Sequence, residues 1–433
     1  TEGGIIDREA QKRGTSVYLV DRTIPMLPER LCNNICSLRP DEDKLTYSVI
    51  FLMDEQAEVK DWHLAKTVTR SNRRFIYEEV QQVLEAHGEA SPEDYDNPDD
   101  HVDPERPEYE PAEHFATELI TLNRMAKHLR QRRFQNGAVD FDRQETRFDI
   151  DAEGKPLGVY FKVAKDANKL VEEFMLLANR TVAESIGKVG KNKTPKVFVY
   201  RIHDQPDQEK LMNLSELVMK FGLRLKPTGS TSAVSQSINK MLHEAKKTKA
   251  RNLIEMVTLR AMMKAKYSTE NIGHYGLAFD YYTHFTSPIR RYPDLMVHRL
   301  LYHYAEGGRS VMKSKWEEQC EHASSMEQTA ALAERASIKY KEVEFMQDRI
   351  GQEYDGTISG VTEYGLYVEI NENKCEGFVP LRDLDDDYYE FDERNYCLWG
   401  RRYHNRYSLG DEVRIKIASA NLDRKQLNFA LVK

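Results

Sequence analysis

The sequence predicts an α+β fold: a large mixed domain that ends near residue 348, followed by a small closed β-barrel. Three observations lead to this prediction. At roughly 100–200 residues per domain, a chain of 433 residues suggests two to four domains. Apolar residues recur at helical spacing in many segments before residue 348, with strand-like runs among them. After residue 350 the pattern changes to short alternating strands separated by glycine turns.

The clearest helix is expected over Asp166–Lys188, where Leu170, Phe174 and Leu177 share one face and Asp166 is the expected N-cap. The other helices are expected over residues 77–86, 112–131, 207–221, 231–245, 252–267, 293–305 and 314–348. Strands are expected over residues 16–19, 45–53, 138–150, 158–163 and 196–202. This mixture of helices and strands predicts one large α+β domain over residues 1–348.

The last eighty or so residues are expected to form a second domain, residues 351–433. They contain GQEYDGTISGVTEYGLYVEI, CEGFVPL and SLGDEVRIKIASANLDRKQLNFALV, which predict five short strands with glycine turns. This pattern is typical of a small closed barrel. Tyr364 and Tyr367 would lie on opposite faces of a regular strand, but a bulge at Gly365 would turn both outward.

The whole net charge of −8 comes from one segment. Residues 91–111 read SPEDYDNPDDHVDPERPEYEP, with five prolines, nine acids and one arginine, so the rest of the chain is neutral. Prolines prevent a helix or a sheet ladder, and like charges keep the segment extended. We therefore expect a flexible acidic insertion over about residues 88–112. It is either a solvated insertion without a specific role or an acidic docking or autoinhibitory segment that competes for a basic channel.

The sequence argues against a membrane protein, a secreted protein and a protein built around disulfides or zinc. No apolar run approaches the ~20 residues of a membrane-spanning helix, and the first twenty residues lack the apolar core of a signal peptide. The five cysteines are odd in number and widely scattered, which argues against both a disulfide framework and a zinc site. We expect a cytoplasmic protein with no membrane partner.

Bases cluster with aromatic residues and glycines at five places in the neutral body. The clusters lie at residues 70–75, 130–134, 188–196, 246–251 and 399–407. A single cluster is usually a solvated face, but five of them predict the non-uniform potential that a polyanion needs.

The stretch GHYGLAFDYYTHFTSPIRRYPDLMVHRL, residues 273–300, has the most specific pattern. Pro288 and Pro293 predict a turn, with Pro293 at the first position of a helix. Arg290 and Arg291 then lie just before a helix N-terminus, where backbone N–H groups favour anions. An arginine there can grip a phosphate bidentately. Phosphate binding and a structural ion pair are the two alternatives for these arginines.

This stretch resembles the signature of the ribonuclease II/ribonuclease R (RNB) exoribonucleases. GTSVYLVDRTIPMLPERLCNNICSLRPDEDKL and NKLVEEFMLLAN are similar to further landmarks of that family, and RRYPD is typical of the ribonuclease R branch. The tail resembles an S1 domain, an OB-fold RNA binder, in its GxVxxxxxxGxYV, EGFVPL and LGDEV landmarks. The resemblance covers nearly the whole chain except the acidic insertion. It implies an RNB catalytic domain followed by an S1 barrel.

The resemblance also implies a reaction: hydrolytic, processive 3′→5′ degradation of single-stranded RNA to nucleoside 5′-monophosphates. By motif, Arg290 is the catalytic arginine that holds the scissile phosphate, and Tyr18 clamps the 3′-terminal base. Phe141 is the partner of Tyr18 at the other end of the stacked bases. Glu172 and Glu334 contact ribose hydroxyls, which is one way to distinguish RNA from DNA.

The remaining expected RNA contacts are Arg291 and the S1 aromatics Tyr364, Tyr367 and Phe378, because aromatic side chains on an OB-fold stack bases. The alternatives are ordinary ones: the S1 aromatics and Phe141 as core, Glu172 as an exposed helix acid, and Glu334 as part of a helix ion pair. RNA is the expected partner of a chain that we expect to be a monomer.

The metal site is the main departure from the family pattern. The resemblance implies two Mg²⁺ ions held by a cluster of aspartates upstream of the GTSVYL tyrosine, and Asp7 is the only aspartate before Tyr18. No residue of this chain is therefore assigned as a metal ligand, and the ligands are expected upstream of residue 1. We expect a fragment that lacks the N-terminal part of the RNB domain and the preceding cold-shock domains, and that is inactive alone. The alternative is a catalytically inactive RNA-binding relative. A nucleotide-binding loop is not supported, because GKVGKNKT does not match GxxxxGK[ST].

Overall fold

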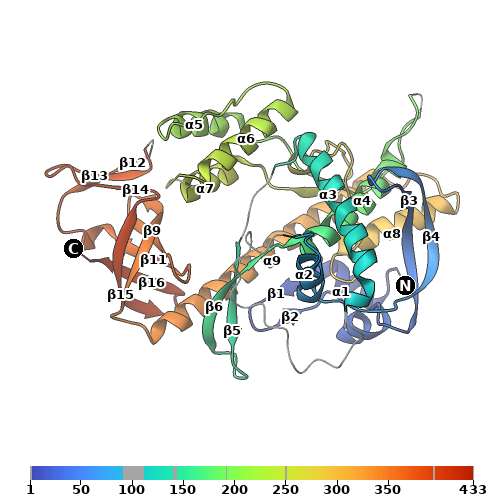
Figure 1. Ribbon diagram of the computed structural model, residues 1–433, viewed down its shortest axis with the longest axis horizontal. Helices are drawn as coiled ribbons and strands as arrows, with labels where there is room; N and C mark the ends of the chain where they lie inside the picture. Colours follow the sequence, from blue (N-terminus) through green and yellow to red (C-terminus); the bar gives the residue numbers. More distant parts are fainter. Residues whose placement is uncertain are drawn as a thin grey trace.

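The computed structural model describes residues 2–90, 112–139, 144–191, 193–248, 251–393 and 395–432 of the chain. The acidic segment 91–111 and Phe141 therefore lie outside the described residues. The architecture is α+β, with a mixed helical region that precedes a closed five-stranded barrel, as the sequence predicts (Figure 1). The long helix α9, Lys313–Gln347, runs from the mixed region to the barrel.

The first half of the chain alternates short sheets and helices. Its elements are α1 (Ile5–Arg13), β1 (Val17–Tyr18), β2 (Thr23–Ile24), η1 (Leu31–Ile35), β3 (Asp43–Met53), β4 (Val59–Arg70), α2 (Tyr77–Ala86), η3 (Ala112–Phe115), α3 (Ala116–Gln135), β5 (Gln144–Ile150), β6 (Pro156–Val163) and α4 (Asp166–Gly187). The strands pair as antiparallel hairpins, β1 with β2, β3 with β4 and β5 with β6.

The second half of the mixed region is mainly helical. Its elements are β7 (Tyr200–Ile202), α5 (Gln208–Met219), α6 (Thr231–Ala245), α7 (Arg251–Ala261), β8 (Lys266–Ser268), η4 (Tyr275–Leu277) and α8 (Tyr292–Ala305). The predicted helix over 252–267 is wrong in its second half. It ends at Ala261, and Tyr267 lies in β8, which pairs with β7 instead.

The barrel consists of β9 (Glu353–Thr362), β10 (Gly365–Ile370), β11 (Glu376–Pro380), β15 (Glu412–Asn421) and β16 (Gln426–Leu431). Around the barrel the strands follow the order β10-β11-β16-β15-β9, and β11 pairs with β16 in parallel. Between β11 and β15 the chain forms η5 (Leu381–Asp383) and a three-stranded sheet of β12 (Tyr389–Asp392), β13 (Cys397–Gly400) and β14 (Arg406–Ser408).

The described residues form three hydrophobic cores, one of which joins α2 to α3, and the other two position the candidate site. In one, α1, α4, β7, β8, α8 and α9 share buried side chains such as Phe198, Met296 and Cys320. In the other, α5–α7 and the end of α9 pack in one continuous cluster with the barrel, through residues such as Ile254 and Phe429. The first core supports the turn that presents Arg290, and the second fixes the barrel against the helices. Among the helices of the described ranges, none combines the length and apolarity needed to cross a membrane.

Candidate nucleic-acid interface

Tyr18 lies against α9, beside Glu334. The Tyr18 N–H donates to Glu334 Oε1 at 3.1 Å, and the Val20 N–H donates to Ser337 Oγ at 3.1 Å. The Tyr18 side chain is 44 % exposed, so its ring is free to meet a ligand. Two residues predicted separately from distant motifs are therefore neighbours in space.

Arg290 is joined to the same segment through the backbone. Its carbonyl oxygen accepts from the Ser16 N–H at 2.9 Å and from Thr15 Oγ1 at 3.1 Å, and the Tyr292 N–H donates to the Gly14 carbonyl at 2.9 Å. In this short antiparallel contact Thr15 lies opposite Arg291, so Arg290 lies beside the residues that lead into β1 and Tyr18. Tyr18, Arg290 and Glu334 thus come together from three parts of the chain.

A close approach and a buried ion pair hold this N-terminal segment. Gly14 has φ +69°, and a Cβ there would lie 2.6 Å from Met326 Cβ on α9, so only glycine fits without a shift. Two turns earlier, on α1, Asp7 Oδ1 accepts from Arg299 at 2.5 Å and from Tyr292 Oη at 3.1 Å. Burial acts to raise the pKa of Asp7, but these bonds and the Gly3 N–H outweigh it and leave the pKa below its ordinary value.

Arg291 forms a structural ion pair, so its guanidinium is not free to bind a phosphate. Its Nε and Nη2 donate to Asp294 Oδ2 and Oδ1 at 2.8 and 2.9 Å, and Asp294 is fully buried. The expectation that the N-terminus of α8 offers free N–H groups is also weakened, because the Tyr292 N–H is bonded to Gly14 and Pro293 has none. In the described part of the chain, the Arg290 guanidinium is exposed and without a side-chain partner.

The surroundings of Arg290 are positively charged. Burial lowers the pKa of His284 well below its ordinary value, and the nearby charges of Arg291, Arg201 and Arg290 lower it further. His284 is therefore neutral, with Nδ1 in hydrogen-bond contact with Tyr267 Oη at 2.8 Å. The positive charge that faces solvent here comes from arginine.

Glu172 lies on α4 and is exposed, 3.4 Å from Arg133 Nη2. Its neighbour Glu173 is the buried acid and forms the closer ion pair with Arg133. No hydrogen bond or ion pair in the described ranges joins Glu172 to Tyr18, Arg290 or Glu334. Phe141 lies outside the described residues, so its expected place at the end of the stacked bases is not tested.

The S1 aromatics form an exposed group on β10 and β11. Tyr367 lies opposite Phe378, with ring centroids 5.0 Å apart, and Tyr364 is 71 % exposed just before β10. Both tyrosines face outward, but the irregularity in the ladder lies between Tyr367 and Val368 rather than at Gly365. Gly365 instead has φ +147° and lets the chain turn into β10. Phe378 is half-buried and outside the barrel core.

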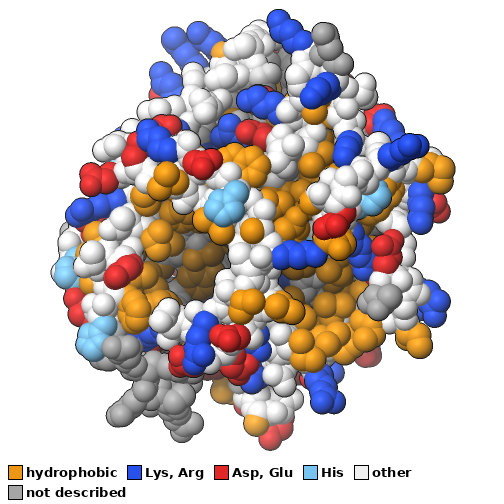
Figure 2. Space-filling view, turned by 90° about the vertical axis from the view of Figure 1, so that its right-hand side faces the viewer, with side chains coloured by type: hydrophobic (Ala, Val, Ile, Leu, Met, Phe, Trp, Pro, Cys, Tyr) orange, Lys and Arg blue, Asp and Glu red, His pale blue; other side chains and the backbone are white. Residues whose placement is uncertain are grey.

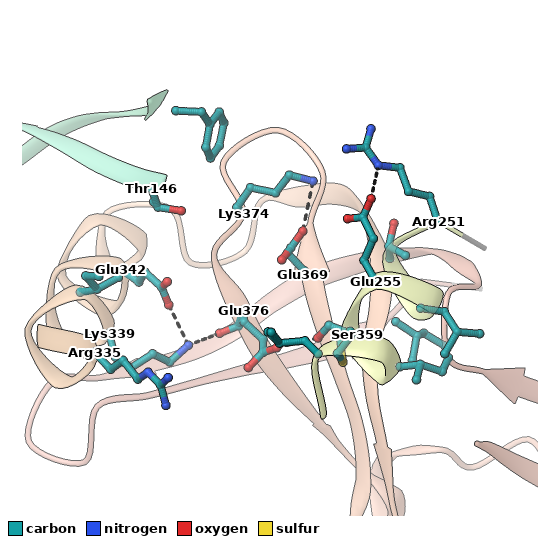
Figure 3. A pocket seen from close by; sticks show the side chains of 18 of the residues that line it. Thr146, Arg251, Glu255, Arg335, Lys339, Glu342, Ser359, Glu369, Lys374 and Glu376 are labelled. Atoms are coloured by element: carbon teal, nitrogen blue, oxygen red, sulfur yellow. Dashed lines mark hydrogen bonds and ion pairs between the residues drawn. The ribbon is translucent and has the colours of Figure 1, made fainter. Parts of the chain in front are cut away.

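A cavity of about 780 Å³ lies between the barrel, α9, α7 and the β5–β6 hairpin (Figure 3). Most of its charges are paired, as in Arg251–Glu255 and Lys374–Glu369, at 2.8 and 3.1 Å. Arg335, next to Glu334 on α9, lines the cavity and has no side-chain partner in the described ranges. The helix that carries Glu334 thus also lines this cavity, which extends toward the barrel.

In two of the five basic clusters some of the bases point inward, although Arg70 of the first cluster stays exposed. Arg133 and Arg130 pair with buried Glu173, and Arg73 is buried beside Glu79 at 3.3 Å. The face on the right of Figure 1 also carries basic and acidic side chains interspersed around a hollow lined by hydrophobic side chains (Figure 2). An extended single-sign surface is therefore absent from that face, and the candidate interface depends on individual groups such as Arg290.

No metal site accompanies these residues in the described ranges. No group of three or more His, Cys, Asp or Glu side chains is placed there to hold a metal ion. Asp7, the one aspartate that precedes Tyr18 in this sequence, is bonded to Arg299. The residues present do not fit the two Mg²⁺ ions that the resemblance implies, so no step is derived through them.

Comparison with known proteins decides the family. The RNB domain model matches residues 1–307, and the S1 RNA binding domain model matches residues 347–431. The chain belongs to the RNB family. Over its full length it is 36 % identical to ribonuclease R of Aquifex aeolicus and 37 % identical to that of Thermotoga maritima. It spans 58 % of the length of each of these RNB relatives.

The fold agrees with this assignment. The apo structure of Mycoplasma genitalium RNase R superposes on the whole chain with a TM-score of 0.87 and 26 % identity, and the chain covers 65 % of that protein. The same bacterial enzyme has also been solved with ribose-methylated single-stranded RNA.

Proposed function

We propose that this chain is the RNA-binding part of a hydrolytic 3′→5′ exoribonuclease that degrades single-stranded RNA to nucleoside 5′-monophosphates. The observation that carries the proposal is that hydrogen bonds bring Tyr18, Arg290 and Glu334 together. The Tyr18 N–H donates to the Glu334 carboxylate, and the Arg290 carbonyl accepts from the Ser16 N–H. An aromatic ring, an unpaired guanidinium and a carboxylate suit a base, a phosphate and a ribose hydroxyl, respectively.

In this proposal Tyr18 stacks on the 3′-terminal base, Arg290 holds the scissile phosphate, and the second oxygen of Glu334 accepts from a 2′-hydroxyl. Glu172 and Phe141 meet nucleotides farther from the 3′ end. Arg291 is left out of this set, since its guanidinium is bonded to Asp294 on two sides. The strand then follows α9 through the cavity beside Arg335 to the S1 face of Tyr364, Tyr367 and Phe378.

The ions needed for hydrolysis have no ligand set in the described residues, so we assign binding and positioning to the groups named here. We further propose that the 433-residue chain alone binds RNA without cutting it, whereas the Mg²⁺-dependent reaction needs ligands from elsewhere. Incubation of the chain with 5′-labelled poly(A) and Mg²⁺ tests this. Processive shortening of the label to very short products would contradict it.

Binding itself is tested by fluorescence anisotropy with single-stranded RNA and DNA of the same sequence. We expect tighter binding of RNA, and we expect Glu334→Gln to reduce the preference because the carboxylate acceptor is lost. Equal binding of RNA and DNA by the unaltered chain would contradict the assignment of Glu334. A catalytically inactive RNA-binding relative would give the same result, so this assay tests the RNA contacts and not the catalytic activity.

We also propose that residues 1–348 and 351–433 are the two domains, and that the protein is a cytoplasmic monomer. Light scattering of the purified chain across a concentration series tests the monomer. A mass that rises toward that of a dimer would contradict it.

A further inference from the structure

The turn that presents Arg290 is fixed by groups that do not themselves face solvent. It runs from Ser287 to Arg291 between the buried Phe285 and the start of α8. The Arg290 and Arg291 N–H groups both donate to the Ser287 carbonyl, at 3.2 and 3.1 Å. The turn carries two adjacent arginines: the Arg291 side chain is bonded to Asp294, whereas the Arg290 side chain is exposed to solvent.

Asp294 closes the turn from the side of α8. Its Oδ1 accepts from the Ser287 N–H at 2.6 Å and from Arg291 Nη2 at 2.9 Å, while Oδ2 accepts from Arg291 Nε at 2.8 Å. The Asp294 side chain is fully buried, so these bonds do not compete with water. One carboxylate therefore ties the first residue of the turn to the last.

The other side of the turn is held by the N-terminal segment. The Arg290 carbonyl accepts two bonds from Thr15 and Ser16, and the Tyr292 N–H donates to Gly14. The main chain on both sides of the Arg290 Cα is thus fixed, while its guanidinium is exposed and has no side-chain partner in the described part of the chain. This is the arrangement of a preorganised binding group.

We propose that Asp294 and Arg291 are positioning residues for Arg290, and that Arg291 makes no contact with RNA. To reach a phosphate, the Arg291 guanidinium would have to leave a buried carboxylate unpaired, which is strongly unfavourable. Its planar fork fits the two carboxylate oxygens, and a lysine cannot reproduce that geometry. The proposal rests on the proposed function, since it assumes that Arg290 holds a phosphate.

Salt dependence of RNA binding separates a positioning role from a direct contact. For single strands, each neutralised phosphate contributes about −0.7 to the slope of log K against log[salt]. We therefore expect Arg290→Ala to make the slope shallower by about 0.7. Arg291→Lys keeps a positive charge but loses the fork, so a direct contact would survive this change whereas a positioning role would not.

The expected result is that Arg291→Lys and Asp294→Asn weaken RNA binding in the chain with Arg290 and have no effect in the Arg290→Ala background. Equal weakening in both backgrounds would overturn the proposal, as would an Arg291→Lys variant that binds RNA like the unaltered chain. Should Asp294→Asn fail to fold, Arg291→Lys carries the same comparison. Thermal unfolding of each variant sets a temperature at which all are folded.

Failure of the proposed function has a different signature. If the unaltered chain does not bind single-stranded RNA, the proposed function fails and this proposal fails with it. If the chain binds RNA but Arg290→Ala binds equally well, RNA binding stands and the role of Arg290, with its positioning residues, is refuted.

Discussion

Replacing Tyr364 by alanine should weaken RNA binding without affecting the fold. The side chain is 71 % exposed and lies just before β10, outside the barrel core, so little packing is lost on truncation. Stacking of one base on an aromatic ring contributes roughly 1–3 kcal/mol, and 1.4 kcal/mol is about tenfold in affinity. The dissociation constant should therefore rise by about fivefold to 150-fold.

The assay is fluorescence anisotropy of a 5′-labelled oligouridylate at fixed salt, because stacking tolerates any base. Tyr388→Ala is the matched control: this tyrosine is 76 % exposed, but it lies beside the separate β12–β14 sheet. It should bind RNA like the unaltered chain. If both variants bind like the unaltered chain, or both weaken equally, the assignment of the β10–β11 face as the stacking surface is refuted.

Three further predictions concern stability, each measured as the free energy of unfolding in urea. Gly14→Ala should lower it by about 1–3 kcal/mol, since a Cβ at positive φ meets Met326, and an unchanged midpoint would contradict this. Asp7→Asn should lower the free energy of unfolding by about 1–3 kcal/mol at pH 7, which is less than the loss of a fully buried ion pair because Arg299 is partly exposed. In the unaltered chain this contribution should be lost as the pH falls through the lowered pKa of Asp7. Burial raises the pKa of Glu342, so the native state keeps this proton to higher pH, and the free energy of unfolding should fall as the pH rises through that pKa. Glu342→Gln should remove this pH dependence. An identical pH profile for the variant and the unaltered chain would refute the prediction.

Local patterns in the sequence were sufficient to predict the elements that bury a regular apolar face. Helices α2 and α6 lie where helical spacing predicts them, and the barrel strands lie where alternation and glycine turns predict them. The element β4 was missed because Val59–Arg70 is rich in polar residues and is a strand only through its pairing with β3. Helix α1 was missed for a similar reason, since its place depends on the ion pair of Asp7 with the distant Arg299.

The candidate site shows the same division between local and long-range information. Motifs identified Tyr18, Arg290 and Glu334 one by one, but their contact depends on hydrogen bonds between main-chain and side-chain groups more than 270 positions apart. The sequence does not show whether Arg290 or Arg291 has a free guanidinium, because phosphate binding and an ion pair are both compatible with two adjacent arginines. The aspartate that decides it, Asp294, was visible in the RRYPD stretch only as an acid in the first turn of a helix.

The three-stranded sheet of β12, β13 and β14, which lies between β11 and β15 in the chain, was also missed. Its three strands contribute Leu398 to the shared core and place Trp399 on the outer face, whereas the sequence suggested only a basic cluster at residues 399–407. One of those bases, Arg401, is paired with Glu390. Charge clusters in a sequence therefore overestimate the free positive surface, since they do not show which acids fold against them.

The most direct test of the central claim is to locate the RNA 3′ end on the chain. A single-stranded RNA with a photoreactive 4-thiouridine at its 3′ terminus would be crosslinked to the 433-residue chain, and the modified peptides would be identified by mass spectrometry. Crosslinks to the peptides that contain Tyr18, Arg290 or Glu334 are the predicted result. Crosslinks confined to the S1 barrel, residues 351–433, would contradict the account.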